Sequence, residues 1–289
     1  MEQSAPPTAA SERRSPTPAA ARKRKGVRHL KQALIDGRFD LHYQPIVSVR
    51  DGSVASVEAL LRWKDPAAEQ AEHAELAGLV WFVERSPVIF RLQDWALGEA
   101  CQAAASWRGT PLRDMRVNVN VSAHGLPRSR LPGHLQRQLR ACDLDAKSIA
   151  LEITETSRMD DFDAAGAQLE RLMAMGVELW LDDFGTGHSS LEWLSRLPVH
   201  GVKLSSTFAC RPGQDRCRAI VTRVVQMAHD LGLRVVAEGV EEQGQMDRLV
   251  RYGCVEYQGF LFSPAVPADA FAELLRSGIG TPPIAPNRS

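Results

Sequence analysis

Long apolar stretches are missing from this sequence, and so are the features of an exported protein. No run approaches the roughly 20 apolar residues of a membrane-spanning helix. The basic N-terminus lacks the apolar core of a signal peptide. The five cysteines are scattered, odd in number and form no CxxC pair, which argues against a zinc site or a disulfide framework. We therefore expect a cytoplasmic protein without membrane segments.

A net charge of either sign is also missing, since 35 Lys and Arg balance 35 Asp and Glu. No global field then favours nucleic acid or a membrane surface, and only residues 1–31 are basic. Outside the predicted barrel helices there is no helix-turn-helix candidate, so direct DNA binding is not expected. Residues 1–26 have no hydrophobic period and are predicted to be a disordered basic tail, either simply solvated or touching nucleic acid or anionic lipid. Residues 277–289, rich in Gly and Pro, are predicted to be a flexible C-terminal tail.

What the sequence does contain, over residues 27–276, is an alternation of short β-like runs with longer helical runs. Eight such β-like runs favour a TIM-type (β/α)8 barrel over an open parallel sheet. The first two runs are joined by the short turn Arg50-Asp51-Gly52-Ser53, so one strand should be antiparallel. The expected strands are Leu41–Val47, Val54–Leu61, Met115–Val121, Ile149–Thr154, Val177–Leu181, Gly201–Leu204, Arg234–Ala237 and Val255–Phe260.

Polar residues interrupt seven of these runs near their carboxyl ends. Each one alone is what a loop start commonly carries. In a TIM barrel, however, the carboxyl ends of the strands meet at one mouth, where active sites are built, so these side chains should form a single acidic cup. They are Glu58, Asn120, Glu152, Asp182, Asp183, Lys203, Glu238 and Gln258.

Several carboxylates so close together would repel one another, and a bound cation would relieve that repulsion. Oxygen ligands without His or Cys point to Mg²⁺ or Mn²⁺. Two such ions about 3.5–4 Å apart can activate a water and stabilise the leaving oxygen of a phosphodiester. A lysine at the same mouth would neutralise charge on the phosphoryl oxygens. The pattern therefore predicts a two-metal phosphodiester site.

Glu58-Ala59-Leu60, within Val57–Trp63, resembles the signature of EAL domains, which are cyclic di-GMP phosphodiesterases and receptors. A three-residue match alone would carry no weight. Further segments resemble the family in order and spacing over roughly residues 30 to 275. They are Leu41–Val47, Asn118–Ser122, Leu151–Glu155, Asp182–Leu191, Ala237–Glu241 and Gln258–Phe260.

The resemblance implies Mg²⁺- or Mn²⁺-assisted hydrolysis of cyclic di-GMP to the linear dinucleotide. It implies that Glu238 orients or deprotonates the attacking water and that Lys203 polarises this water and the phosphate. The implied direct metal ligands are Glu58, Asn120, Glu152 and Asp182, with Asp183 helping to hold the second ion.

Other matched positions surround the metal site. Gln44, Leu60, Arg62 and Gln258 match positions near the bound nucleotide. Glu155 matches the glutamate that anchors the loop Phe184–Ser190, which in the family joins the metal site to a homodimer interface. The resemblance thus implies cyclic di-GMP as ligand and a homodimer formed through the loop after Asp183.

Three positions depart from the family pattern. Active members usually carry Lys-x-Asp where this chain has Lys203-Leu204-Ser205. A Ser hydroxyl has no formal charge and cannot replace a carboxylate that supports the second metal. The segment Asp65–Ala77 looks shorter and more polar than the corresponding segment of the family, which borders the nucleotide pocket. His188 stands where a Tyr is common in the family. It is either a solvent-exposed residue without a specific role or a pH-sensitive residue of the loop.

Three classes of function therefore stay open at this stage. The first is a metal-dependent phosphodiesterase acting as a bacterial signalling and virulence regulator. The second is a receptor that binds cyclic di-GMP without turnover. The third is a regulator of gene expression that uses the barrel to bind a regulatory protein partner.

The departure at Ser205 can be tested by restoring the acid. Ser205→Asp is expected to raise Mg²⁺-dependent hydrolysis of cyclic di-GMP, because it returns a negative charge to the second metal position. Initial rates with Mg²⁺ for the wild type and the variant measure the effect. An unchanged rate would mean that position 205 does not support a metal.

Overall fold

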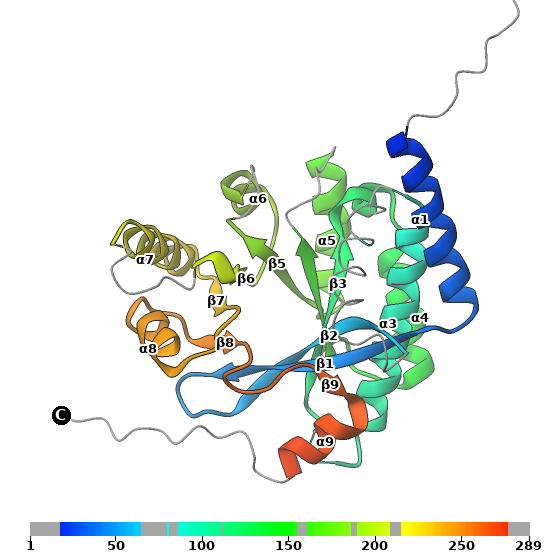
Figure 1. Ribbon diagram of the computed structural model, residues 1–289. Coiled ribbons are helices and arrows are strands. Elements are labelled where there is room, and N and C mark those ends of the chain that lie inside the picture. Colours follow the sequence, from blue (N-terminus) through cyan, green and yellow to red (C-terminus); the bar gives the residue numbers. More distant parts are fainter. Residues whose placement is uncertain are drawn as a thin grey trace, which may run out of the picture.

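The strands form one sheet that closes on itself as a barrel (Figure 1). The computed structural model describes residues 18–64, 80, 86–110, 112–154, 161–185, 190–208 and 215–276. The strand order is β2-β3-β4-β5-β6-β7-β8-β1-β9, and β1 also pairs with β2, which closes the barrel. The strands are β1 (Phe39–Ser48), β2 (Val54–Trp63), β3 (Arg116–Ser122), β4 (Ile149–Thr154), β5 (Glu178–Phe184), β6 (Gly201–Leu204), β7 (Arg234–Ala237), β8 (Glu256–Gln258) and β9 (Val266–Pro267).

The predicted TIM-type barrel with one antiparallel strand is confirmed. Strands β2 to β8 pair in parallel, whereas β1 runs antiparallel to both β2 and β8. The eighth expected run, Val255–Phe260, forms a strand only at Glu256–Gln258. The two-residue strand β9 was not predicted; it pairs with His42 and Tyr43 of β1.

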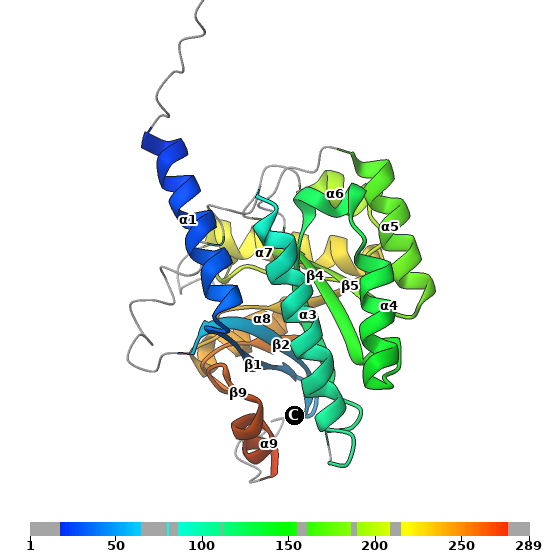
Figure 2. The ribbon, with the colours of Figure 1, turned by 90° about the vertical axis from the view of Figure 1, so that its right-hand side faces the viewer.

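Helices cover the outside of this barrel (Figures 1 and 2). Alternate strand residues point outward toward the helices, and strand residues such as Val117 and Leu151 share one buried apolar cluster with the helix residues Leu97 and Leu135. Within the described residues, no helix is long and apolar enough to cross a membrane. The helices are α1 (Pro18–Ile35), α3 (Val88–Ser106), α4 (Leu131–Cys142), α5 (Phe162–Ala174), α6 (Ser190–Arg196), α7 (Asp215–Asp230), α8 (Gln243–Arg251) and α9 (Ala268–Arg276).

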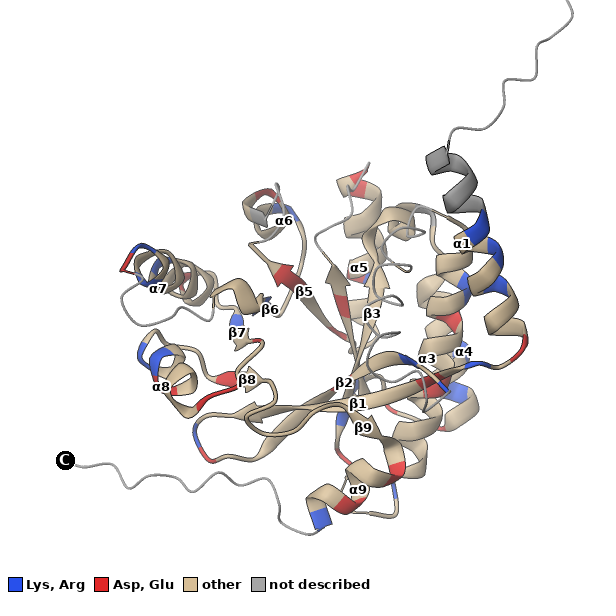
Figure 3. Ribbon diagram, in the orientation of Figure 1, with Lys and Arg blue, Asp and Glu red and all other residues tan. Residues whose placement is uncertain are grey.

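Helix α1 corrects the predicted boundary of the disordered tail. It starts at Pro18, so residues 18–26 are helical. Leu30 and Ala33 anchor the helix by burying against residues of α3. Once anchored, the helix extends back through Ala, Arg and Lys residues, which favour helix without any apolar period. Lys25, Arg28 and Lys31 of this helix are exposed, and Figure 3 shows several basic residues along α1.

The structure contains a disulfide that the sequence did not predict. Cys217 of α7 is disulfide-bonded, whereas Cys101, Cys142 and Cys254 are free. Spacing along the chain did not indicate this disulfide, because the distance between two cysteines in the fold decides whether they can bond. Residues 1–17 of the predicted N-terminal tail (1–26) and the whole predicted C-terminal tail (277–289) lie outside the described residues.

The barrel interior is built in layers, because every second residue of a strand points inward. At the amino ends of the strands, Glu178 of β5 pairs with Arg116 of β3, at 2.5 Å, and with Arg234 of β7. The next layer is apolar and consists of Ile46, Ala150, Trp180 and Val236. Polar side chains at the carboxyl ends form the layer above it. The apolar layer therefore separates the ion pairs from the predicted site.

Gly201 makes room for the large Trp180 ring in the apolar layer. A Cβ at position 201 would lie 2.3 Å from that ring and 2.8 Å from the carbonyl oxygen of Arg234. Gly201→Ala is therefore expected to lower the free energy of unfolding by about 1–3 kcal/mol through overpacking. Urea unfolding followed by circular dichroism measures the change.

A matched control is Gly166→Ala in helix α5, where an added Cβ meets no atom within 4 Å. This control should raise the free energy of unfolding by about 0.5–1 kcal/mol, because Ala favours helix over Gly. Equal stabilities of the two variants would contradict the packing described for Gly201.

Candidate functional site

A buried lysine lies at the centre of four carboxylates at the carboxyl ends of the strands. The Nζ atom of Lys203 on β6 lies 2.7 Å from Glu58 Oε2 and 2.9 Å from Glu152 Oε2. It lies 2.7 Å from Glu238 Oε1 and 3.5 Å from Asp182 Oδ1. The Lys203 side chain is only 1% exposed. One ammonium group thus neutralises part of the charge of four acids.

These acids meet because each one comes from a different strand. Glu58 belongs to β2, Glu152 to β4 and Asp182 to β5, while Glu238 directly follows β7. On either side of Glu58, the buried residues Val57 and Ala59 belong to the core cluster that contacts the helices. The period of two in a strand therefore turns the acids inward and their apolar neighbours outward.

Amide side chains hold Glu58 in place. Asn120 Nδ2 donates to Glu58 Oε1 at 2.6 Å, and Gln258 Nε2 donates to Glu58 Oε2 at 2.8 Å. The same Gln258 amide donates to Gln44 Oε1 at 3.0 Å, and Gln44 donates to the carbonyl of Ser263 at 3.2 Å. Gln44 and Glu58 are also directly opposite in the pairing of β1 with β2. These contacts connect the acidic cluster to β1 and β8.

The same surroundings shift the pKa values of these groups in opposite directions. Burial favours the neutral form of Glu58, but the charge of Lys203 and three hydrogen bonds outweigh it, and the pKa of Glu58 is lowered. For Glu152, burial followed by the charge of Glu58 raises the pKa well above its ordinary value. Burial likewise raises the pKa of Glu238. Burial opposes the charge of Lys203, yet the four carboxylates together raise its pKa.

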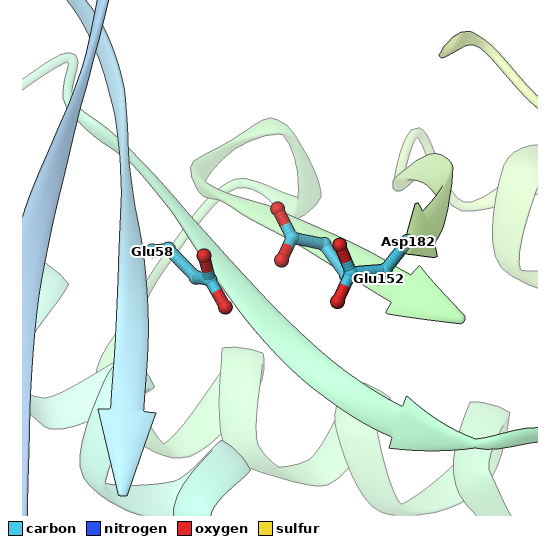
Figure 4. Close-up of side chains that lie close together, drawn as sticks. All are labelled: Glu58, Glu152 and Asp182. Atoms are coloured by element: carbon cyan, nitrogen blue, oxygen red, sulfur yellow. The ribbon is translucent and has the colours of Figure 1, made fainter. Parts of the chain in front are cut away.

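Three of the acids have the arrangement of a metal site (Figure 4). Glu58, Glu152 and Asp182 each offer one carboxylate oxygen, and these oxygens all lie within 4.8 Å of one another. Asp182 Oδ1 is buried and accepts no hydrogen bond from the described residues. A set of oxygen ligands with an unused acceptor suits Mg²⁺ or Mn²⁺. The residues present therefore fit a divalent cation.

A comparison with known protein families shows which family the chain belongs to. The family described as EAL domain matches residues 27–265. This chain belongs to the EAL domain family.

Curated relatives support the assignment to the EAL family. The chain is 39% identical over 249 residues to "Cyclic di-GMP phosphodiesterase NbdA" of Pseudomonas aeruginosa, covering 86% of this chain and 31% of the relative. It is 37% identical over 241 residues to "Bifunctional diguanylate cyclase/cyclic di-GMP phosphodiesterase MucR" of the same organism, covering 83% of this chain and 35% of the relative. The chain thus spans about a third of the length of these relatives.

Solved structures show the same EAL fold. The structure titled "PaMucR Phosphodiesterase, c-di-GMP complex" matches with a TM-score of 0.71 at 35% identity, covering 86% of this chain and 99% of that one. The cAMP-bound form of the EAL enzyme Bd1971 matches with a TM-score of 0.81 at 27% identity, covering 89% of this chain and 70% of that one.

Most of the residues predicted for the EAL site lie together. Besides the lysine and the four acids, Asn120, Gln44 and Gln258 join the network described above. Leu60 and Arg62 follow Glu58 at two-residue steps on β2, and Arg62 Nη1 donates to the carbonyl of Leu61 at 2.9 Å. Their predicted roles at the nucleotide stay predictions.

Asp183 differs from the other predicted ligands. It is half-buried, has a φ of 54°, and lies where the pairing of β5 with β6 shifts register. This left-handed conformation breaks the alternation of the strand directly after Asp182. Glu155, His188 and Asp65–Ala77 lie outside the described residues, so the predicted loop anchor and two of the three departures stay predictions.

Asn118, which was not among the predicted site residues, also lies in this cluster. It is buried on β3, and its Nδ2 donates to Glu152 Oε1 at 2.7 Å. The signal available was its spacing of two residues from Asn120, which puts both amides on the inward face of β3. Ser205, the departure at the second metal position, is buried and only 5% exposed.

The charge balance around Lys203 generates a prediction. Lys203→Met keeps the volume but leaves the four acids without their cation, so the metal-free protein should lose about 3–5 kcal/mol of unfolding free energy. Mn²⁺ should restore a large part of this loss, because the ion replaces the missing positive charge. Thermal unfolding in EDTA and in millimolar Mn²⁺ measures both effects.

The control is Lys31→Met on the exposed face of α1, which should change the free energy of unfolding by less than about 0.5 kcal/mol. If the Lys203 variant in EDTA were as stable as the wild type, the acids would not depend on the lysine.

Proposed function

We propose that this EAL domain is a metal-dependent phosphodiesterase that hydrolyses cyclic di-GMP to the linear dinucleotide. The observation that carries the proposal is the group of Glu58, Glu152 and Asp182, with oxygens within 4.8 Å of one another beside Lys203. Two curated relatives named as cyclic di-GMP phosphodiesterases, at 39% and 37% identity, support a hydrolase. A solved relative is a phosphodiesterase in complex with cyclic di-GMP.

The metal would be held by Glu58, Asn120, Glu152 and Asp182, with Asp183 at a second ion. When bound, Mg²⁺ or Mn²⁺ would lower the pKa of a water and polarise the phosphoryl oxygen.

The side chains of the domain itself supply the remaining steps. Glu238 is 19% exposed at the barrel mouth, where solvent and substrate can reach it, and accepts the proton of the attacking water. Lys203 Nζ, 2.7 Å from Glu238 Oε1, orients that carboxylate and offsets negative charge that develops on the phosphate. The water oxygen bonds to phosphorus, the P–O3′ bond breaks, and a solvent water protonates the leaving O3′, which completes the hydrolysis of one phosphodiester bond.

Nucleotide binding is assigned to Gln44, Leu60, Arg62 and Gln258. Burial lowers the pKa of Arg62, and the nearby charge of Glu58 opposes that shift. A guanidinium stays charged at neutral pH and can bind a phosphate through two hydrogen bonds. Leu60 and Arg62 lie beyond Glu58 along β2, which places them outward from the metal cluster, toward the mouth.

A catalytically silent receptor is the second candidate, and Ser205 favours it. This buried Ser directly follows β6, where active family members carry Asp, so the second ion lacks one carboxylate. The homodimer through the loop after Asp183 and a regulatory protein partner are kept as proposals. Leu191 of α6, which directly follows that loop, is an apolar side chain that is 64% exposed and suited to a contact between subunits.

Incubation of the purified protein with cyclic di-GMP and Mg²⁺ or Mn²⁺, followed by chromatography, tests the proposal. The wild type should produce the linear dinucleotide. Glu238→Gln should lower kcat by about 100- to 10,000-fold, because it removes the proton acceptor. Binding of cyclic di-GMP to this variant, measured by calorimetry, should persist.

Glu170→Gln, on the exposed face of α5, is the matched control and should retain the wild-type rate. If the wild type leaves the substrate intact but binds it, the receptor is correct. If it neither cleaves nor binds the nucleotide, the domain functions as a protein-binding regulator.

A further inference from the structure

Asn118 is a buried amide that reaches one of the metal-site carboxylates. It lies on β3 and is 1% exposed. Its Nδ2 donates to Glu152 Oε1 at 2.7 Å, while the other oxygen, Glu152 Oε2, lies 2.9 Å from Lys203 Nζ. The two oxygens of Glu152 therefore have different partners, and Asn118 holds the one that points away from the lysine.

The two asparagines of β3 donate diagonal hydrogen bonds to acids on the two neighbouring strands. Asn118 is in register with Glu58 of β2 but bonds to Glu152 of β4. Asn120 is in register with Glu152 but bonds to Glu58. Each amide thus reaches the acid that is not opposite to it, and β3 holds the carboxylates of both neighbouring strands.

Packing alone does not account for an amide at position 118. Asn118 is paired with Ala150 of β4, which belongs to the apolar layer of the barrel. Its Oδ1 is buried and accepts no hydrogen bond from the described residues. A buried acceptor without a partner opposes folding, so an apolar side chain would suit this layer better. The amide at position 118 therefore contributes through its Nδ2 donor, which binds Glu152 Oε1.

The chemistry of the contact also requires a neutral donor. A basic side chain at position 118 would add a second cation beside Lys203, and an acidic one would add a fifth carboxylate. A serine is too short to reach across from β3 to β4. An asparagine amide donates one well-oriented hydrogen bond without changing the net charge of the cluster.

We propose that Asn118 is a positioning residue for the metal ligand Glu152. It fixes Oε1 and so leaves Oε2 directed at the centre of the cluster, where Glu58 and Asp182 also offer an oxygen. The inference rests on the metal site of the proposed function and adds to it an outer residue that sets the orientation of one ligand. Residues of this kind contribute about 10- to 100-fold to metal affinity.

Mn²⁺ binding to the full chain, followed by the electron paramagnetic resonance signal of free Mn²⁺, tests the inference. Asn118→Leu keeps the size of the side chain but removes the donor, and it should weaken Mn²⁺ binding by about 10- to 100-fold. Asn118→Ala should weaken it by a similar factor. The control is Ser56→Ala, at a buried polar position two residues before Glu58 on β2, which should keep wild-type affinity.

Steady-state kinetics separate positioning from packing. In Asn118→Leu, kcat at limiting Mn²⁺ should fall, saturating Mn²⁺ should restore it, and KM for cyclic di-GMP should stay unchanged. A packing role would spare the Leu variant and impair only the Ala variant, and that result would overturn the proposal. Wild-type Mn²⁺ affinity in Asn118→Leu would overturn it as well, and so would a wild type that binds no Mn²⁺.

The outcomes also distinguish this inference from the proposed function. If the wild type does not cleave cyclic di-GMP but Asn118→Leu still loses Mn²⁺ affinity, the phosphodiesterase assignment fails and the positioning role stands. If Asn118→Leu does not fold, the Mn²⁺ affinity of Asn118→Ala decides. Loss of affinity in that variant supports the proposal, and wild-type affinity overturns it.

Discussion

The burial of one lysine among four carboxylates is the interaction on which the rest of this structure depends. Removing Lys203 and its partners from water is costly, and their mutual attraction offsets that cost only if every distance is held closely. A closed barrel provides this control, because each acid is attached to a different strand and the strands are fixed by their pairing. The fold therefore determines the geometry of the site more than any loop does.

The layers below the site contribute to its electrostatics. Trp180 and its apolar neighbours exclude water beneath the acids, and burial is the largest cause of the raised pKa of Glu152. At the opposite end of the barrel, Glu178 pairs with Arg116 and Arg234, and the charge of Glu256 acts on both arginines. The apolar layer lies between the two charged layers, yet while burial lowers the pKa of Arg116, the charge of Glu152 still opposes that larger effect across the layer.

The amide side chains give the acidic cluster its order. Carboxylates that repel one another would otherwise turn apart. Asn120 and Gln258 bind the two oxygens of Glu58, and Asn118 binds one oxygen of Glu152. Each amide donates a hydrogen bond without adding charge, so the cluster keeps its attraction for a cation. Such preorganisation is what a metal site needs before the ion arrives.

The sequence by itself determined the family, the barrel and most of the polar side chains that meet at its mouth. Strand ends can be recognised where an acid such as Glu58 or Glu152 interrupts an apolar run, and all such ends of a parallel barrel meet at one mouth. The helical structure of residues 18–26 was not predicted, because these residues have no apolar period. Their helix continues from the part of α1 that is anchored by the buried side chains of Leu30 and Ala33.

Only the tertiary structure decided which oxygen faces which donor. Asn118 is in register with Glu58 yet bonds to Glu152, and Asn120 does the reverse. Diagonal contacts of this kind depend on the tilt of the strands around the barrel axis. That tilt is a property of the closed sheet as a whole, so it leaves no local pattern along the chain from which the contacts could be read.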